Sequence, residues 1–186
     1  MIFVFSCSKH REKDGFEKIS SDSLSTYINN AKNDKLPISK RIFFNVNAFK
    51  ILKDQRNDLS TREKMYDVSK IFYLLKKEKE FKEAVNQTLK ISLDAKDSLF
   101  TARSINLIAN QYINISQNDS AFFYLLKSER LFTKVKDSIG LGKNYIDKAF
   151  VQLYESDYSG CELSCIQGLS YLKNFNLSQS EYDAYN

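Results

Sequence analysis

The stretch "KDSLFTARSINLIA" (residues 96–109) returns forty residues later as "KDSIGLGKNYIDKA" (residues 136–149). Both copies begin with lysine, aspartate and serine, continue with an aliphatic residue, and reach an alanine at the same distance. A period of about 20–50 residues is the signature of repeat architectures, in which one supersecondary unit stacks on its copy. The stretch therefore predicts a stack of similar helical units. Asp97 and Asp137, or the serines that follow them, are expected to cap a helix in each unit.

Composition also favours helices. The chain has 186 residues, of which 42% are hydrophobic and 27% charged, so it can bury a core of ordinary size. Five glycines and one proline are few for an all-β protein. The sequence therefore predicts an all-α fold.

The repeated stretch divides the chain into units of similar length. Each unit is expected to hold two helices joined by a polar turn, because apolar residues recur at helical spacing on both sides of that turn. We expect a tail and linker, a degenerate helical hairpin, three full units and the start of a further, truncated unit, at residues 1–19, 20–56, 60–96, 97–136, 137–176 and 178–186.

Small residues recur where two paired helices must approach closely. The pairs are twelve residues apart: Phe72 and Ala84, Ala109 and Ala121, Ala149 and Cys161. Cys161 and Cys165 are one helical turn apart, which suits side-by-side packing better than a disulfide. We expect both cysteines to be small core residues.

This pattern resembles the tetratricopeptide repeat family over roughly residues 60–175. The resemblance rests on an aromatic residue three positions before the second helix's alanine, as Phe81 precedes Ala84, and on that alanine itself. The proline that ends the family's repeat is absent, and the units are 37 and 40 residues long, with the extra residues expected between repeats. The resemblance implies a right-handed α-solenoid of antiparallel helix pairs, whose first helices line a groove for a protein or peptide partner.

The same resemblance places a partner groove on the first helix of each unit. Carried over by position, it comprises Tyr66, Ser69, Tyr73, Lys76, Arg103, Asn106, Asn110, Ile113, Lys143, Ile146, Phe150 and Leu153. Amide and cationic groups beside tyrosine supply directional hydrogen bonds and adaptable aromatic contacts. The family's clamp for a C-terminal carboxylate is not expected, because Leu107 and Asp147 stand where it uses polar and basic residues.

Charge and motifs argue against several other functions. The net charge is +5, but lysine and arginine alternate with acidic residues, so we expect solvated helix faces and no nucleic-acid contact by this segment. None of the common phosphate-loop, hydrolase or metalloprotease motifs occurs, and an enzyme is not expected. With His10 as its single histidine, the chain has no Cys/His set at zinc spacing, and neither a metal nor a cofactor is expected.

The N-terminus suggests an attachment to a membrane. The sequence "VFSC" at residues 4–7 resembles a bacterial lipobox, in which the cysteine, here Cys7, is lipidated. The alternative is a short apolar N-terminus that packs on the first helix or is disordered. No stretch approaches the roughly 20 apolar residues that span a bilayer. Localisation at the cell envelope, on the periplasmic or surface side of a bacterial membrane, is expected; the alternative is the cytoplasm.

Taken together, these features are similar to the sensory repeat regions of membrane-tethered bacterial regulators. The expected function is a protein- or peptide-binding module that forms the input part of a larger signalling regulator, tethered through Cys7 or a downstream segment. The alternative is a surface lipoprotein that acts as a scaffold or assembly factor without an output domain. A downstream apolar span followed by a kinase or DNA-binding pattern would distinguish the first from the second.

Overall fold

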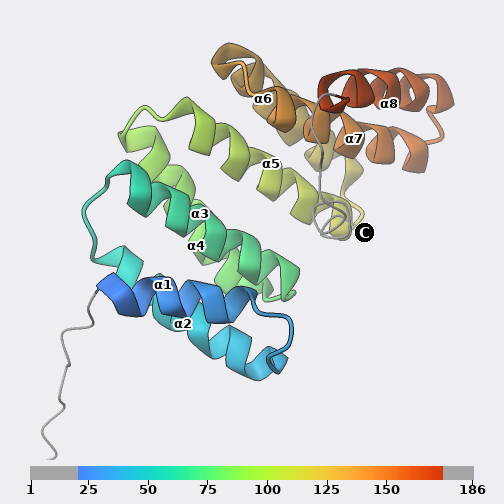
Figure 1. Cartoon of the computed structure of the whole chain (residues 1–186). Helices are drawn as coiled ribbons and strands as arrows, with labels where there is room; N and C mark the ends of the chain where they lie inside the picture. The colour runs from blue at the N-terminus through green and yellow to red at the C-terminus, as the bar shows by residue number, and fades with distance from the viewer. Residues whose placement is uncertain (1–20, 174–186) are drawn as a thin grey trace, which may run out of the picture.

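The computed structural model describes residues 21–173, and within that range the chain forms eight α-helices and no β-strand (Figure 1). The all-α prediction is confirmed. The helices are α1 (Ser21–Lys32), α2 (Ile38–Lys53), α3 (Leu59–Leu74), α4 (Glu78–Asp94), α5 (Ser98–Asn114), α6 (Asn118–Val135), α7 (Ser138–Tyr154) and α8 (Tyr158–Leu172). The predicted lipidation site Cys7, the tail at residues 1–19 and the truncated unit at residues 178–186 lie outside the described residues.

Aspartate residues start several of these helices. Asp97 accepts hydrogen bonds from the backbone N–H groups of Leu99 and Phe100, both at 3.1 Å, and so caps α5. Asp137 caps α7 in the same way through Gly140 N, at 3.0 Å. A side-chain oxygen at this position satisfies N–H groups that have no partner within the helix. The prediction that the repeated "KDS" caps a helix is confirmed, and of the two alternatives it is the aspartates and not the serines that act as caps.

The turns between helices share one conformation. A residue with positive φ, between 53° and 61°, occurs every twenty residues, at Lys76, Lys96, Ser116, Lys136 and Ser156. At each of the five turns, the N–H of the next residue donates to a carbonyl five residues earlier, over 2.8–3.1 Å. This is the Schellman arrangement, in which a left-handed residue ends the helix and the backbone pairs its last carbonyls. The same Schellman turn therefore follows both the first and the second helix of a unit.

These turns correct the predicted unit length and alignment. Lys76, Ser116 and Ser156, which follow the first helices, are forty residues apart, so the unit of 37 residues is wrong. The turns between units are no longer than the turns within them, so the extra residues that were expected between repeats are not found there; the helices of these units have 15–18 residues. With a uniform step of forty, Ser69 corresponds to Ala109 and Ala149.

The helices pack in chain order, each against the next. The odd-numbered helices also contact one another, α1 with α3, α3 with α5 and α5 with α7. No comparable contact joins two even-numbered helices in the part of the chain that the structure describes. Contacts between neighbouring units therefore run through the odd-numbered helices, whose side of the molecule we call the inner side; the side of the even-numbered helices is called the outer side.

The largest core cluster lies in α1–α4. It is continuous and includes Leu52, Met65 and Phe72, none of which is more than 1% exposed. Leu107 of α5 is buried at its edge, which explains why this position is apolar. Burying side chains of this size stabilises the fold by about 1.5–3 kcal/mol each.

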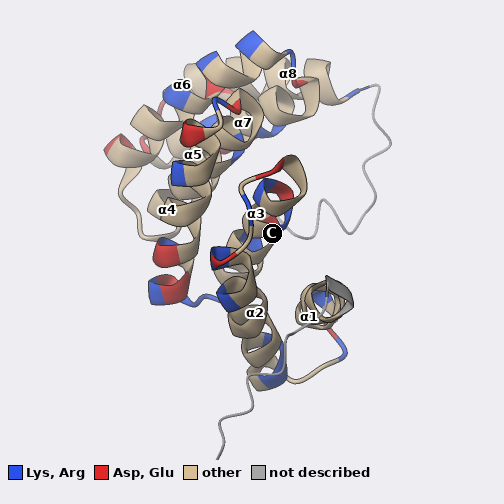
Figure 2. Ribbon diagram, turned by 90° about the vertical axis from the view of Figure 1, so that its left-hand side faces the viewer, with Lys and Arg blue, Asp and Glu red and all other residues tan. Residues whose placement is uncertain are grey.

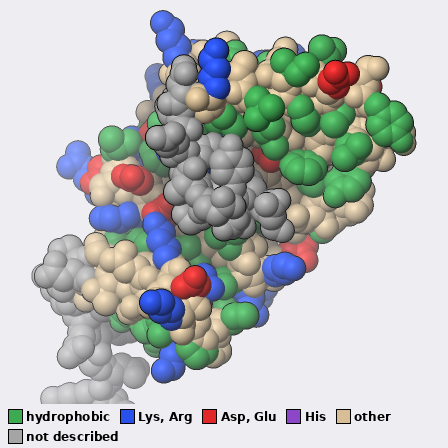
Figure 3. Space-filling model, turned by 45° about the vertical axis from the view of Figure 1, so that its right-hand side comes forward, with side chains coloured by type: hydrophobic (Ala, Val, Ile, Leu, Met, Phe, Trp, Pro, Cys, Tyr) green, Lys and Arg blue, Asp and Glu red, His purple; other side chains and the backbone are tan. Residues whose placement is uncertain are grey.

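The last helix differs from expectation. Cys161 and Cys165 are free thiols of intermediate exposure, so they are not core residues as predicted. Leu163, Ile166 and Leu169 of the same helix are more than half exposed. Figure 3 shows hydrophobic side chains gathered over this end of the molecule.

Candidate functional site

The predicted groove residues belong to α3, α5 and α7 and to the turn after α3. We call the sides of these three helices that are turned away from the even-numbered helices the odd-helix face. Because successive odd-numbered helices touch, side chains from neighbouring units can meet on this face.

Of the four predicted residues of the first unit, two reach toward α5. The ring of Tyr66 lies 6.0 Å from the ring of Phe100, and the hydroxyl of Tyr73 hydrogen-bonds Asn114. The prediction for Ser69 is wrong: this residue is fully buried and its hydroxyl lies 2.9 Å from Thr88 Oγ1 of α4. Lys76 is exposed, but it occupies the turn between α3 and α4.

The wrong prediction for Ser69 has one cause. The first unit was aligned with the second by a shift of 37 residues in place of 40, so a small residue in the contact between α3 and α4 was assigned to the groove. With the forty-residue step, Glu63 and Lys70 correspond to Arg103 and Asn110. The evenly spaced turns, rather than the recurring alanines, are the signal that gives the correct register.

On α5, the predicted residues are mostly buried between units. Asn106 is 9% exposed and Asn110 is 7% exposed. The Arg103 guanidinium lies over the Phe100 ring and 3.5 Å from Asp137 Oδ2, so it ties α5 to the aspartate that caps α7. Ile113 is half-buried against the small apolar cluster that α5 shares with α6 and α7.

On α7, the predicted residues divide between the odd-helix face and the contact with α8. Lys143 is half-buried, whereas Phe150 and Leu153 are exposed by 44% and 46%. Ile146 lies against Gly168 of α8, where an added Cβ would be 2.8 Å from its Cδ1. It therefore contributes to the packing of α7 on α8.

The structure adds Asp147 to the site. This residue is 7% exposed on α7, one turn after Lys143, and Asn106 Nδ2 donates to its Oδ2 over 3.1 Å. The side chain of Asn110 also hydrogen-bonds the carboxylate. Burial raises the pKa of Asp147 to about 7, against the opposing effect of the two amides and the Lys143 cation. Sequence analysis had treated Asp147 only as a departure from the carboxylate clamp.

The tyrosine next to this cluster is neutral near pH 7. Burial raises the pKa of Tyr66 to about 12, with the Arg103 cation acting in the opposite direction. Its hydroxyl therefore remains a hydrogen-bond donor and acceptor over the physiological range.

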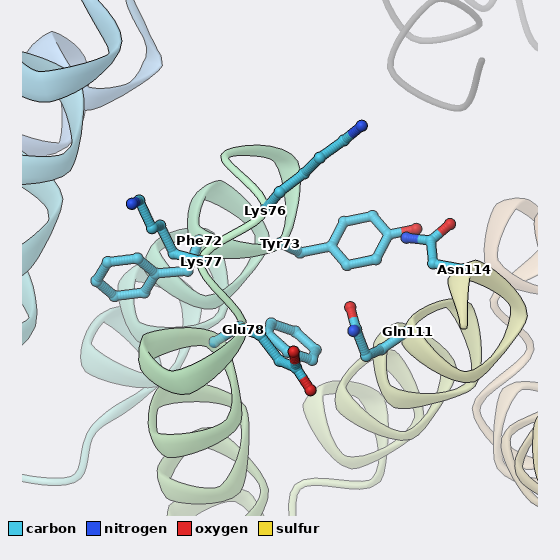
Figure 4. Close-up of a pocket in the computed structure, with 8 residues that line it drawn as sticks. Phe72, Tyr73, Lys76, Lys77, Glu78, Gln111 and Asn114 are labelled. Atoms are coloured by element: carbon cyan, nitrogen blue, oxygen red, sulfur yellow. The ribbon is translucent and has the colours of Figure 1, made fainter.

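A pocket of about 310 Å³ opens where α3 and α5 end. Figure 4 shows Tyr73 pointing across it with its hydroxyl beside the Asn114 amide, and Gln111 on the same helix as Asn114. The other lining residues are Phe72, Lys76, Lys77, Glu78 and Phe81. The pocket combines two buried aromatic rings with amide groups and charges of both signs, a mixture suited to a side chain of a protein partner.

Charge is mixed over the surface. Figure 2 shows Lys and Arg interspersed with Asp and Glu along the helices, without a continuous basic stripe on that side. Among residues 21–173, no group of three His, Cys, Asp or Glu side chains is placed to hold a metal ion. None of the helices in this range is both long and apolar enough to cross a membrane.

Comparison with known proteins leaves the family open. No protein-family model matches the chain. No curated protein matches it either. The function is therefore argued from the geometry of the odd-helix face and the pocket at its end.

Proposed function

We propose that the chain is a right-handed, tetratricopeptide-like α-solenoid that binds an extended segment of a protein or peptide along its odd-helix face. The tetratricopeptide resemblance and the series of contacts between odd-numbered helices support this arrangement. The partner would lie across α3, α5 and α7, so that each unit contributes a few contacts.

One observation carries the proposal. The Oδ1 atom of Asn110 is buried and has no hydrogen-bond partner, although the residue lies among polar side chains of adjoining units. A buried amide oxygen without a partner costs about 1–3 kcal/mol. Asn110 as a residue is 7% exposed, so displacement of the side chains that cover its oxygen would let a donor from a bound segment reach it and recover part of this cost. Backbone N–H groups of an extended chain are such donors, and they recur along its length.

The pocket supplies a second kind of contact. A partner side chain would enter it beside Tyr73 and Asn114, while the partner backbone continues toward α7. Aromatic and amide groups of this kind are common at the centres of protein interfaces. By the sequence resemblance, the module would be the input part of a larger bacterial signalling regulator, with its output domain elsewhere.

The test is a peptide-display selection on the full chain, followed by calorimetric titration of the enriched peptides. Asn110→Ala should weaken binding about tenfold, because it removes one buried hydrogen bond. Tyr73→Phe removes only the hydroxyl beside the pocket and should weaken binding less. Asn86→Ala is the matched control, because Asn86 is exposed on α4, on the outer side.

The proposal fails if no peptide is enriched, or if enriched peptides bind Asn110→Ala and Tyr73→Phe as tightly as the wild type. Circular dichroism of each variant separates loss of binding from loss of fold.

A further inference from the structure

A polar cluster between α5 and α7 consists of Asn106, Asn110 and Asp147. The charge state of the Asp147 carboxyl group determines which end of each amide, N–H or oxygen, is turned toward it. An ionised carboxylate only accepts hydrogen bonds, whereas an amide has a donor end and an acceptor end. Both amides therefore turn their N–H groups to Asp147, as Asn106 Nδ2 does at 3.1 Å. The oxygen of Asn110 is then directed away from the carboxylate, where it has no partner.

Protonation of Asp147 would reverse this preference. A neutral carboxyl group carries an O–H donor, which needs an acceptor in a buried site. The two amides that already hydrogen-bond Asp147 each carry an oxygen that can accept this proton, and an amide that turns its oxygen to Asp147 turns its N–H group away from it. The cluster thus has two hydrogen-bond patterns, related by one proton and an amide rotation.

Among the titratable groups around this cluster, Asp147 is the one whose charge changes near pH 7. Lys143 on α7 favours the charged carboxylate, and Arg103 on α5 is 3.5 Å from Asp137. On α3, Tyr66 and Tyr73 interact with Asp147 electrostatically, and burial raises the pKa of both hydroxyls, so they remain neutral near pH 7. The pKa of Asp147, at about 7, lies in the range where small pH changes alter its charge.

We infer that Asp147 is a proton-dependent positioning residue that sets the orientation of the Asn106 and Asn110 amides, and thereby the hydrogen-bonding preference of the odd-helix face. With Asp147 ionised, the Asn110 oxygen is the acceptor of the cluster that has no partner, and it favours an N–H donor. With Asp147 protonated, one amide turns its N–H group away from the carboxyl group and the local charge rises by one, which favours carbonyl and carboxylate oxygens. The consequence for partners rests on the proposed function, but the switch itself is a property of the free chain.

The switch is tested without any ligand, by nuclear magnetic resonance on the full chain between pH 5 and 9. The Asp147 side-chain carbon should titrate with a midpoint near 7. The side-chain N–H signals of Asn106 and Asn110 should move with the same midpoint. In Asp147→Asn these movements should vanish, whereas in Asp94→Asn, which alters an exposed carboxylate on α4, they should persist. The inference is overturned if the Asp147 carbon titrates with a midpoint near 4, or if the amide signals do not shift as Asp147 titrates.

A second experiment tests the consequence for partners. Display selections at pH 6 and pH 8 should enrich different peptides, with at least a several-fold rise in Asp and Glu content at pH 6. Asp147→Asn should remove the difference while still enriching peptides. If the amide signals switch but the two selections agree, the partner preference is overturned and the switch stands. If neither selection enriches a peptide, the proposed function fails independently of the switch.

Discussion

The two halves of the stack follow one repeat plan but are held together differently. α1–α4 surround one continuous apolar cluster, whereas α5–α8 contain two small clusters. Polar contacts between helices occur in both halves, since Asn45 Nδ2 of α2 donates to Val68 O of α3 over 3.0 Å. In the second half, Asn144 Nδ2 donates to Leu125 O over 3.1 Å. The second half adds a close backbone approach between α7 and α8, where an added Cβ at Gly168 would be 3.0 Å from a backbone oxygen of α7. Similar helix geometry therefore does not require similar cores.

This difference has a consequence for the candidate site. The odd-helix face joins α3, which belongs to the well-packed half, to α5 and α7 of the half with smaller clusters. Regions with few buried apolar contacts open at lower free energy. We therefore expect α7 and α8 to adjust to a partner while α3 remains fixed.

The largest expected effect is in the first half. Phe72→Ala removes a fully buried ring from the main cluster and should lower the free energy of unfolding by about 3–5 kcal/mol. Phe123→Ala, at a ring that is 62% exposed on α6, should change it by less than about 0.5 kcal/mol. Chemical denaturation of both variants measures the contrast, and equal losses would contradict the assigned core.

A smaller effect is expected where α7 and α8 approach each other. Gly168→Ala places a Cβ 2.8 Å from Ile146 Cδ1 and 3.0 Å from a backbone oxygen, so the helices must separate, at a cost of about 1–3 kcal/mol. Hydrogen exchange should show lost protection in α8 and unchanged protection in α4. Gln167→Ala, at the exposed neighbouring position, is the control. Loss of protection throughout the chain would mean that the two halves do not open separately.

The pH dependence of stability tests the cluster between α5 and α7, within the second half. The pKa of Asp147 is about 7 in the folded chain and near 3.8 without burial, so the folded state holds this proton more tightly. Its contribution to stability is therefore full below about pH 4 and is lost as the pH rises toward 7. Asp147→Asn should remove this loss and be more stable than the wild type at pH 8 by roughly 1–2 kcal/mol. A difference that does not grow between pH 4 and pH 8 would rule out the raised pKa.

The smallest effect concerns the turns, which are alike in both halves. Lys136 has a φ of 57°, which glycine adopts without the steric cost that other residues meet. Lys136→Gly should raise the melting temperature slightly, with a gain of at most about 1 kcal/mol. Lys134→Gly, two residues earlier inside α6, should lower stability by about 0.5–1 kcal/mol. Effects of the same sign at both positions would contradict the assigned turn.

Sequence reasoning was most reliable where it read local hydrogen bonding. The aspartates of "KDS" cap helices because capping depends on a few neighbouring residues. The register of the first unit was wrong because the internal turns of the units share no sequence signature: Lys76 and Lys77 in the first unit correspond to Ser116 and Gln117 in the second. A recurring alanine was then taken as the marker, although Phe81 and Ala121 hold the equivalent positions.

The site was harder to predict than the fold for a physical reason. In the sequence, Asp147 is only a departure from the family's carboxylate clamp, whereas its burial follows from the contact of α7 with α5 and with Asn106, 41 residues away. Tyr66 and Tyr73 were predicted as residues of the partner groove, and in the structure both reach toward α5. Contacts between units depend on how neighbouring units pack against each other, and the sequence of one unit alone does not determine this packing.

The most direct test of the account is hydrogen exchange of the full chain with and without a display-selected peptide. Binding along the odd-helix face predicts added protection in α3, α5 and α7, and in the turn that holds Lys76, with little change in the middle of α4 and α6. Protection confined to α6 and α8, where Phe123, Leu163 and Ile166 are exposed, would place the partner on the outer side and contradict the proposed function.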